Sequence, residues 1–256
     1  MELAVDIGNT TINLGFYQEN VLKYKYVFDT SFDIDYFSIF KANIKDIKYD
    51  DVHNIIFSSV VPTISLIVKE ALGKLMHGAS IYEVSSDIDY GVKMNIDNPS
   101  EVGSDLVCDL VAAKAKYSSP LLVIDLGTAT KYLYLDENSI FQSALIMPGL
   151  KLSTKSLFSK AELLPDVDLK TPTSLMDSKN TISCIKNGVI YGQLEMIKGL
   201  SNSYQKETAK KLTKIITGGD QNLFYQFLKD EDFIFDDSLV LDGALNILHM
   251  ILERGN

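Results

Sequence analysis

The chain has 256 residues and a formal net charge of −10, with 46% hydrophobic and 23% charged residues. These fractions are typical of an ordinary globular protein, and the length allows one large domain or two small ones. The negative charge argues against a broad nucleic-acid footprint or an anionic membrane surface, and no apolar run is long enough to span a bilayer. Because the N-terminus lacks a signal segment and Cys108 and Cys184 are expected to be reduced core thiols, we expect a cytoplasmic protein.

The first predicted element is a hairpin in residues 3–16, LAVDIGNTTINLGF. Two β-rich runs flank a turn in which Asn9 tolerates a positive φ and Gly8 has no Cβ, so we predict a tight turn there. The backbone N–H groups and hydroxyls of Gly8, Asn9, Thr10 and Thr11 can cradle an anion, and Asp6 beside them can hold a hydrated Mg²⁺. The alternative is an ordinary hairpin in which these side chains only satisfy the turn.

Strands and helices alternate between this hairpin and residue 120. We predict strands at 21–28, 52–61 and 80–84, helices at 32–44, 63–76 and 103–117, and a polar loop at 87–101. Asp105 lies at the start of the last of these helices. It is either a solvated first-turn residue, which the helix dipole favours, or a base that orients a substrate hydroxyl.

A second strand–turn–strand unit appears at residues 121–135, LLVIDLGTATKYLYL. Its Asp, Gly and final Thr lie 119 positions after those of the first hairpin, and its turn comprises Gly127, Thr128, Ala129 and Thr130. A repeat at nearly half the chain length indicates two related halves, 1–117 and 118–256. Two such cradles facing each other across a cleft could hold the two ends of a polyphosphate.

The remaining sequence alternates further helices and strands. We predict a strand at 140–147 with a helix after it, an extended connection at 163–177, a long helix at 181–204, a strand at 212–216 and a helix at 238–252. Gly188 and Gly192 inside the long helix suggest close packing against another element, because glycine is costly there. The turn at Thr217, Gly218 and Gly219 would let a backbone approach a phosphate.

The motifs in this order resemble those of the type III pantothenate kinases, members of the acetate kinase, sugar kinase, Hsp70 and actin superfamily. The matching segments cover nearly the full length: DIGNTT at 6–11, SSVVP at 58–62, NPSEVGSD at 98–105, DLGTAT at 125–130, IMPGL at 146–150, LLPDVDL at 163–169, NT at 180–181, NGVIYGQ at 187–193, TGG at 217–219 and LVLDGAL at 239–245. No GxxxxGK[ST] or GxGxxG segment is present, which argues against a P-loop or a Rossmann domain.

The resemblance implies an α/β fold of duplicated ribonuclease-H-like domains, as in actin-like ATPases, with a nucleotide cleft between them. It implies a homodimeric kinase that makes 4′-phosphopantothenate from pantothenate and ATP, the first step of coenzyme A biosynthesis. By this resemblance Asp105 would be the catalytic base, and Gly103, Ser104 and Thr181 would bind the substrate, with Thr181 lent to the partner subunit. Asp6 would hold the Mg²⁺, and Asp125 would lie at a monovalent cation (K⁺ or NH₄⁺). The ATP would be bound by Gly8–Thr11, Gly127–Thr130, Gly218 and Gly219.

The chain departs from the family pattern at five positions. Leu106 stands where an arginine would hold the pantothenate carboxylate, and Ile96 replaces a tyrosine that contacts the substrate. Lys131 follows the second turn where a threonine is usual, and Ser143-Ala144 replaces two glycines. The alternatives are therefore a divergent kinase for another small alcohol, or a catalytically weak, nucleotide-binding regulatory homodimer.

Overall fold

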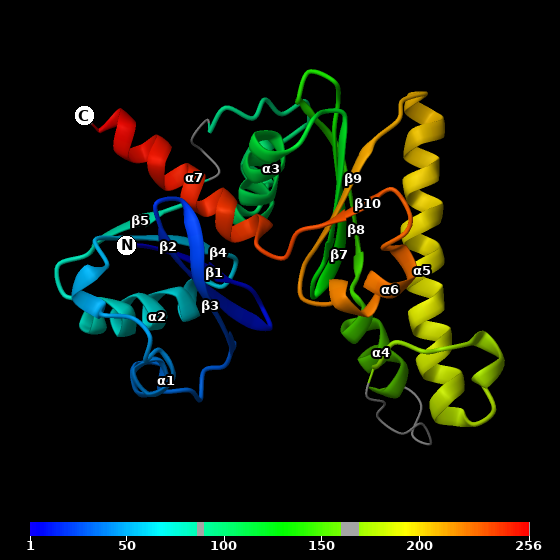
Figure 1. The fold of residues 1–256 in the computed structure, drawn as a ribbon, viewed down its shortest axis with the longest axis horizontal. Coiled ribbons are helices and arrows are strands. Elements are labelled where there is room, and N and C mark those ends of the chain that lie inside the picture. Colours follow the sequence, from blue (N-terminus) through cyan, green and yellow to red (C-terminus); the bar gives the residue numbers. More distant parts are fainter. Residues whose placement is uncertain (86–89, 160–168, 256) are drawn as a thin grey trace. The chain divides into compact units, whose positions relative to one another are not determined.

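The computed structural model describes residues 1–85, 90–159 and 169–255, which form two compact units (Figure 1). The first unit comprises Met1–Lys116 and Ser238–Asn256, and the second comprises Tyr117–Asp237. These units differ from the halves expected from the sequence, because the last helix of the chain packs with the first unit. Nearly all of the LLPDVDL motif at 163–169 lies outside the described residues.

The first unit is built on a five-stranded sheet in the order β3-β2-β1-β4-β5. β1 pairs antiparallel with β2 and parallel with β4. The strands are β1 (Glu2–Ile7), β2 (Thr11–Gln18), β3 (Val21–Asp29), β4 (Asn54–Ser59) and β5 (Ser80–Glu83). The helices of this unit are α1 (Tyr36–Asn43), α2 (Pro62–Leu75), α3 (Ser104–Lys116) and α7 (Leu239–Arg254).

The second unit is built on a sheet in the order β10-β9-β6-β7-β8. β6 pairs antiparallel with β7 and parallel with β9. The strands are β6 (Leu121–Leu126), β7 (Ala129–Leu135), β8 (Phe141–Pro148), β9 (Thr213–Thr217) and β10 (Phe233–Phe235). The helices of this unit are α4 (Leu150–Ser159), α5 (Thr181–Thr208) and α6 (Tyr225–Leu228).

The two sheets have the same topology, which confirms the repeat predicted from the sequence. Each has three consecutive antiparallel strands followed by two parallel ones, so β1 corresponds to β6 and β4 to β9. β1 and β6 begin at Glu2 and Leu121, the same 119-position offset that separates the two turn motifs. The architecture is the expected duplicated ribonuclease-H-like α/β fold.

Each unit has its own apolar core. In the first, side chains of β1, β2 and β4 pack against α1 and α2, with Phe40 and Leu72 fully buried. In the second, alternate residues of β6, β7 and β9 pack against α5, whose Ile190 and Ile197 are fully buried. No helix of the described ranges is both long and apolar enough to cross a membrane.

The tightest hairpin turn lies after β2, not after β1. Glu19 and Asn20 have φ of 51° and 63°, whereas Asn9 does not have a positive φ. The first turn is instead a wider loop in which the Gly8 N–H donates to the Thr11 carbonyl at 2.9 Å. The expectation of a positive φ at Asn9 is therefore wrong. The two-residue turn whose positive φ angles match the twist of the flanking strands is Glu19-Asn20.

Helix α5 exposes its glycines. A Cβ at Gly188, Gly192 or Gly199 would meet no heavy atom of the described chain within 4 Å. The interpretation that Gly188 and Gly192 pack closely against another element of the same subunit is therefore wrong. Cys184 is also exposed, so it is not the core thiol expected from its apolar neighbours, whereas Cys108 is buried and burial raises the pKa of its thiol.

Helices α3 and α7 cross at a glycine. A Cβ at Gly243 would lie 2.0 Å from the carbonyl oxygen of Cys108, so no larger residue fits without moving one of the helices. This contact holds α7 against the helix that carries Asp105. It explains why α7, although it follows the second unit in the chain, belongs to the first.

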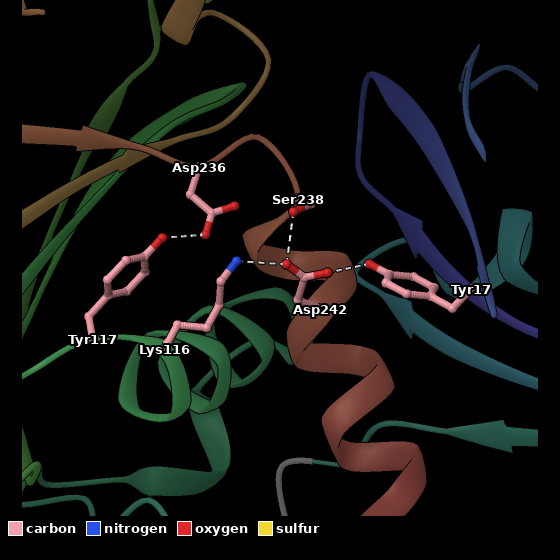
Figure 2. A network of polar contacts seen from close by, with 6 residues as sticks. All are labelled: Tyr17, Lys116, Tyr117, Asp236, Ser238 and Asp242. Carbon is pink, nitrogen blue, oxygen red and sulfur yellow. Dashed lines mark hydrogen bonds and ion pairs between the residues drawn. The ribbon is translucent and has the colours of Figure 1, made fainter. Parts of the chain in front are cut away.

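The chain passes between the units twice, at Lys116-Tyr117 and at Asp237-Ser238. In the first unit, Asp242 accepts hydrogen bonds from the Tyr17 hydroxyl at 2.5 Å and the Ser238 hydroxyl at 2.8 Å, and its Oδ2 lies 2.8 Å from the Lys116 ammonium (Figure 2). In the second, the Tyr117 hydroxyl donates to Asp236 at 2.7 Å. Residues beside both crossings are thus fixed within their own units.

Candidate active site

The first group of candidate residues lies at one edge of the first sheet. Because β1 and β4 are parallel, their carboxyl ends lie side by side, and the Val60 N–H donates to the Ile7 carbonyl at 3.1 Å. Asp6 is one residue before this point, where its Oδ2 accepts a hydrogen bond from the Asn13 amide at 3.1 Å. The strand pairing thus orients one carboxylate beside the first turn.

The turn at Gly8–Thr11 is held by Thr30, the residue that follows β3. The Thr30 N–H donates to the Thr10 carbonyl at 2.9 Å, and the Thr30 hydroxyl donates to the Gly8 carbonyl at 2.8 Å. Asn9 and Thr10 are exposed at its tip. A Cβ at Gly8 would make only an ordinary contact, 3.4 Å from the Thr11 carbonyl, so the protein's own packing does not require glycine here.

Asp105 lies at the same edge because Ser104 fixes the start of α3 to the end of β4. The Ser104 hydroxyl accepts from the Ser59 N–H at 2.9 Å and lies 3.1 Å from the Ser59 carbonyl oxygen, to which it donates. We predicted Ser104 as a substrate contact, but its hydroxyl is engaged in this structural link. The sequence therefore brings Asp6, the first turn and Asp105 together through two parallel strand ends and a helix start.

Gly103 leaves room for the Asp105 carboxylate. The Oδ1 of Asp105 accepts the Leu106 N–H at 2.9 Å, and a Cβ at Gly103 would lie 2.6 Å from that same oxygen. A larger residue at 103 would displace the carboxylate. Gly103 thus acts on the position of Asp105, whether or not it also contacts a substrate.

A cavity of about 490 Å³ opens beside these residues in the first unit. It is lined by Ser59, Val60, Glu83, Val84, Ser85, Ser100, Glu101, Val102, Gly103 and Ser104. Its polar groups are hydroxyls and carboxylates, and no basic side chain is among these lining residues. The cavity suits a neutral, hydroxylated molecule better than a carboxylate.

Leu106 is a core residue of α3. Its side chain is only 8% exposed, like Val102 at 7%. Leu106 therefore lies on the buried apolar face of α3, together with Leu110 and Ala113. A leucine here removes the guanidinium that the family resemblance implies.

The second turn, Gly127–Thr130, is packed against Gly149 at the end of β8. The Gly149 N–H donates to the Thr128 carbonyl at 2.9 Å, and a Cβ at Gly149 would lie 2.1 Å from the Gly127 carbonyl oxygen. A Cβ at Gly127 itself would meet nothing closer than 3.4 Å. Gly149 belongs to the IMPGL segment, but its support of this turn is not predictable from that segment alone.

The TGG turn after β9 lies directly on Asp125. Gly218 has φ of 92°, and a Cβ there would come within 2.5 Å of Asp125 Oδ1. The Asp220 N–H donates to the Leu126 carbonyl at 3.0 Å, which closes the turn onto β6. Gly218 is required by this packing, whereas a Cβ at Gly219 would meet no heavy atom of the described residues within 4 Å.

Asp125 is paired with Lys131. Their side chains form an ion pair of 2.9 Å between Nζ and Oδ2. Thr130 lies on the other face of the sheet, where it is 1% exposed and its hydroxyl oxygen accepts from Gln193 at 3.3 Å. If Thr130 contacts a phosphate, it therefore does so through its backbone.

Thr181 is exposed at the first turn of α5. The helix begins with a capping box in which the Asn180 side chain accepts from the Ser183 N–H at 3.0 Å. This cap fixes the helix start without using the Thr181 hydroxyl. Thr181 is therefore presented outward from the second unit.

Among the described residues no group of three or more His, Cys, Asp or Glu could hold a metal ion by itself. Mg²⁺ does not need such a group, because it usually keeps several waters and binds through one or two carboxylates and the substrate phosphates. Asp6 offers one such carboxylate in the first unit. Asp125 does not offer a comparable place for a monovalent cation, because its Oδ2 contacts the Lys131 ammonium.

The fold resembles that of a protein whose structure was solved with a bound nucleotide. The activator of 2-hydroxyisocaproyl-CoA dehydratase from Clostridium difficile, solved with bound ADPNP, superposes with a TM-score of 0.50 over 99% of this chain and 94% of its own, at 12% sequence identity. At that identity the likeness concerns the fold alone.

The sequence comparisons are more specific. Residues 2–203 match the family model for type III pantothenate kinase. The type III pantothenate kinase of an Exiguobacterium species is 32% identical over 99% of both chains, and that of Citrifermentans bemidjiense is 35% identical over 99% of both. The chain therefore belongs to the type III pantothenate kinase family.

Proposed function

We propose that the protein transfers the γ-phosphoryl group of ATP to the primary hydroxyl of pantothenate, giving 4′-phosphopantothenate for coenzyme A biosynthesis. The observation that carries the proposal is the placement of Asp105 at the same sheet edge as Asp6 and the first turn, through Ser104 and the ends of β1 and β4. In a chain of this family, that edge combines a base with a phosphate-binding turn. Catalysis of phosphoryl transfer consists mainly of such positioning and charge stabilisation.

Each turn has a separate role in holding ATP. Gly8–Thr11 and Gly127–Thr130 would bind phosphate oxygens through backbone N–H groups, and Gly219 would lie against the nucleotide. Asp6 would hold a Mg²⁺ through water, and this ion would offset the charge of the β- and γ-phosphates when bound. Membership of the type III pantothenate kinase family supports ATP as the donor.

Asp105 would accept the proton of the pantothenate hydroxyl as that oxygen attacks the γ-phosphorus. Gly103 leaves space for its carboxylate, and the Leu106 N–H fixes one carboxylate oxygen. We assign this carboxylate to the substrate hydroxyl. A base must lie within hydrogen-bond reach of the proton that it removes, which this arrangement allows.

Few residues of this chain are suited to bind the substrate carboxylate. Leu106 replaces the expected arginine, Ile96 replaces the expected tyrosine, and no basic side chain is among the residues lining the cavity. A divergent kinase for an uncharged alcohol therefore stays as the second candidate. The two candidates differ in how much a carboxylate contributes to kcat/KM.

Comparing pantothenate with pantothenyl alcohol, which has a CH₂OH group in place of the carboxylate, measures this contribution. A charge-assisted hydrogen bond to the carboxylate contributes about 1.5–3 kcal/mol, or roughly ten- to over a hundredfold in affinity. Because Leu106 cannot make that bond, we expect both compounds to be phosphorylated with kcat/KM values within about tenfold of each other. Coupled ADP release with purified protein measures both.

A preference for pantothenate well above a hundredfold would show that another cation binds the carboxylate. Turnover of neither compound, in a protein that binds ATP, would contradict the proposed substrate and leave the regulatory alternative. Mock reactions without acceptor give the background ATPase rate in each case.

We also propose a homodimer that uses α5. Its exposed glycines form one stripe with Thr181 and Cys184, since positions three, four and seven apart share a helix face. Near the N-terminal end of α5 the second unit exposes several large apolar side chains: Leu152, Leu157, Leu175, Met176 and Ile182. A second copy would cover these groups and receive Thr181.

Replacing Gly188 with leucine tests this interface. The new side chain would project from a face that has open space in one subunit, so the monomer should fold normally, but the partner helix could not approach. We expect sedimentation to shift toward the monomer and pantothenate turnover to fall, because Thr181 would leave the partner's site. Gly73→Leu in α2 is the matched control, since its Cβ would meet nothing closer than 4.0 Å. A parent protein that already sediments as a monomer would refute the dimer.

We also propose that the enzyme works in the cytoplasm. Both cysteines are free thiols in the structure, as is usual in a reducing compartment.

A further inference from the structure

The pair formed by Lys131 and Asp125 occupies the position at which the family resemblance implies a monovalent cation. The two residues are directly opposite each other on the antiparallel strands β6 and β7, so their side chains leave the sheet on the same face. Their Nζ and Oδ2 atoms are 2.9 Å apart. The strand register, not a flexible loop, brings the ammonium to the carboxylate.

Both side chains are largely removed from solvent. Lys131 is 16% exposed and Asp125 is 14% exposed. The backbone of the TGG turn covers the other carboxylate oxygen, because a Cβ at Gly218 would lie 2.5 Å from Oδ1. An ion pair in such a place is screened little by salt and has a defined geometry.

The pair is next to the second phosphate turn. Asp125 is two residues before Gly127, and Lys131 follows Thr130 directly. A carboxylate alone at this point would repel a phosphate bound to the turn. The ammonium neutralises that carboxylate, as a bound K⁺ or NH₄⁺ would, and it does so with a charge that cannot dissociate.

A second monovalent cation on Asp125 would be strongly disfavoured. Two positive charges about 4 Å apart repel each other enough to weaken binding on the order of a thousandfold at the effective dielectric constant of a partly buried site. The carboxylate has one charge to offset, and Lys131 already offsets it. Asp125 therefore does not fit the cation implied by the resemblance.

We infer that Lys131 is a built-in replacement for the monovalent cation, so this kinase works without K⁺ or NH₄⁺. The inference rests on the proposed function for its kinetic readout, but it concerns the charge at Asp125 and can also be measured without turnover. Lys131 is a positioning residue, since it acts on the phosphate turn through Asp125.

The test compares the parent protein with Lys131→Met, which keeps the length and apolar stem but removes the charge. Rates with Mg·ATP and pantothenate are measured in choline chloride, KCl and NH₄Cl at equal ionic strength. We expect the parent rates to agree within about twofold, and Lys131→Met to lose about ten- to a hundredfold in kcat/KM for ATP in choline chloride. KCl or NH₄Cl should restore much of that loss, because either cation can then occupy the vacated place.

Lys210→Met is the matched control. Lys210 also forms an ion pair in the second unit, 3.4 Å from Glu137, but it is half exposed and away from the turns. Its loss should change neither the rate nor the salt response. Rescue of Lys131→Met by K⁺ separates a charge role from a structural one, since a packing defect would not respond to the choice of cation.

Thermal unfolding and ATP binding in the same salts provide the second readout. We expect K⁺ to raise the unfolding midpoint of Lys131→Met over its value in choline, and to leave that of the parent unchanged. A parent protein that requires K⁺ for turnover, or is stabilised by it, would overturn the inference. A Lys131→Met protein that has parental kinetics and does not respond to K⁺ would overturn it as well.

If neither protein phosphorylates pantothenate, the proposed function fails, while the midpoints and ATP affinities of the parent still decide the role of Lys131. The parent measurements also decide it if Lys131→Met does not fold.

Discussion

Replacing Asp105 with asparagine is expected to lower kcat for pantothenate phosphorylation by about two to four orders of magnitude, the usual contribution of a general base. The substitution preserves the shape of the side chain and an oxygen that can accept the Leu106 N–H, now made by Oδ1 at 2.9 Å. It removes the negative charge and, with it, the ability to take a proton. The unfolding midpoint should therefore change little, and ATP affinity should stay close to that of the parent.

Asp35→Asn is the control for this experiment. Asp35 is also at a helix start in the first unit, where its Oδ1 accepts the Ser38 N–H at 3.2 Å, and asparagine caps helices about as well as aspartate. Its kinetics should be those of the parent. Undiminished turnover in Asp105→Asn would mean that Asp105 only stabilises the start of α3.

The second large effect is expected from Gly149→Ala. The added methyl would lie 2.1 Å from the Gly127 carbonyl oxygen and 2.6 Å from the Thr128 carbonyl oxygen, so the second turn must move. Overpacking of this kind costs about 1–3 kcal/mol of stability, or roughly 2–4 °C in the midpoint for each kcal/mol in a chain of this size. We expect a lower unfolding midpoint without ligand and at least about a tenfold loss of ATP affinity, measured by calorimetry.

Gly127→Ala distinguishes an effect on the folding of the turn from an effect on ligand binding. A Cβ at Gly127 would make only ordinary contacts, the nearest at 3.4 Å to Asp125 Oδ1, so its midpoint without ligand should stay near the parent value. The methyl would nonetheless obstruct a phosphate bound to the turn, and ATP affinity should fall. Parental ATP affinity in Gly127→Ala would refute phosphate binding by this turn, whatever Gly149→Ala does.

The sequence predicted the repeated sheet well because its signals are local. An apolar run, an aspartate, a glycine and a second apolar run lie within one strand–turn–strand unit, and both copies fold as expected. The start of α1 was predicted four residues early, since apolar spacing alone does not show that Asp35 caps the helix at Ser38. β10 and α6 have three and four residues, too few for either periodicity to be seen.

The candidate site was less predictable because its determinants are far apart in the chain. Gly149 supports the second turn from 22 residues away, and Gly218 does so from the end of β9. The pairing of Lys131 with Asp125 follows from the β6–β7 register, which a sequence suggests but does not fix. The hydrogen bond between Ser104 and Ser59 joins residues 45 positions apart, and no local sequence signal predicts it.

The insertion of the second unit within the first has a consequence for synthesis on the ribosome. Tyr117–Asp237 is one continuous segment, so everything its core needs has been translated before α7 begins. The first unit instead waits for Ser238–Asn256, and until then the face of α3 at Cys108 lacks the helix that Gly243 allows to pack against it. Domains generally fold as units during translation. The second unit can therefore complete its fold before the first, although the first unit begins earlier in the chain. The helix that bears Asp105 would thus acquire its final support last.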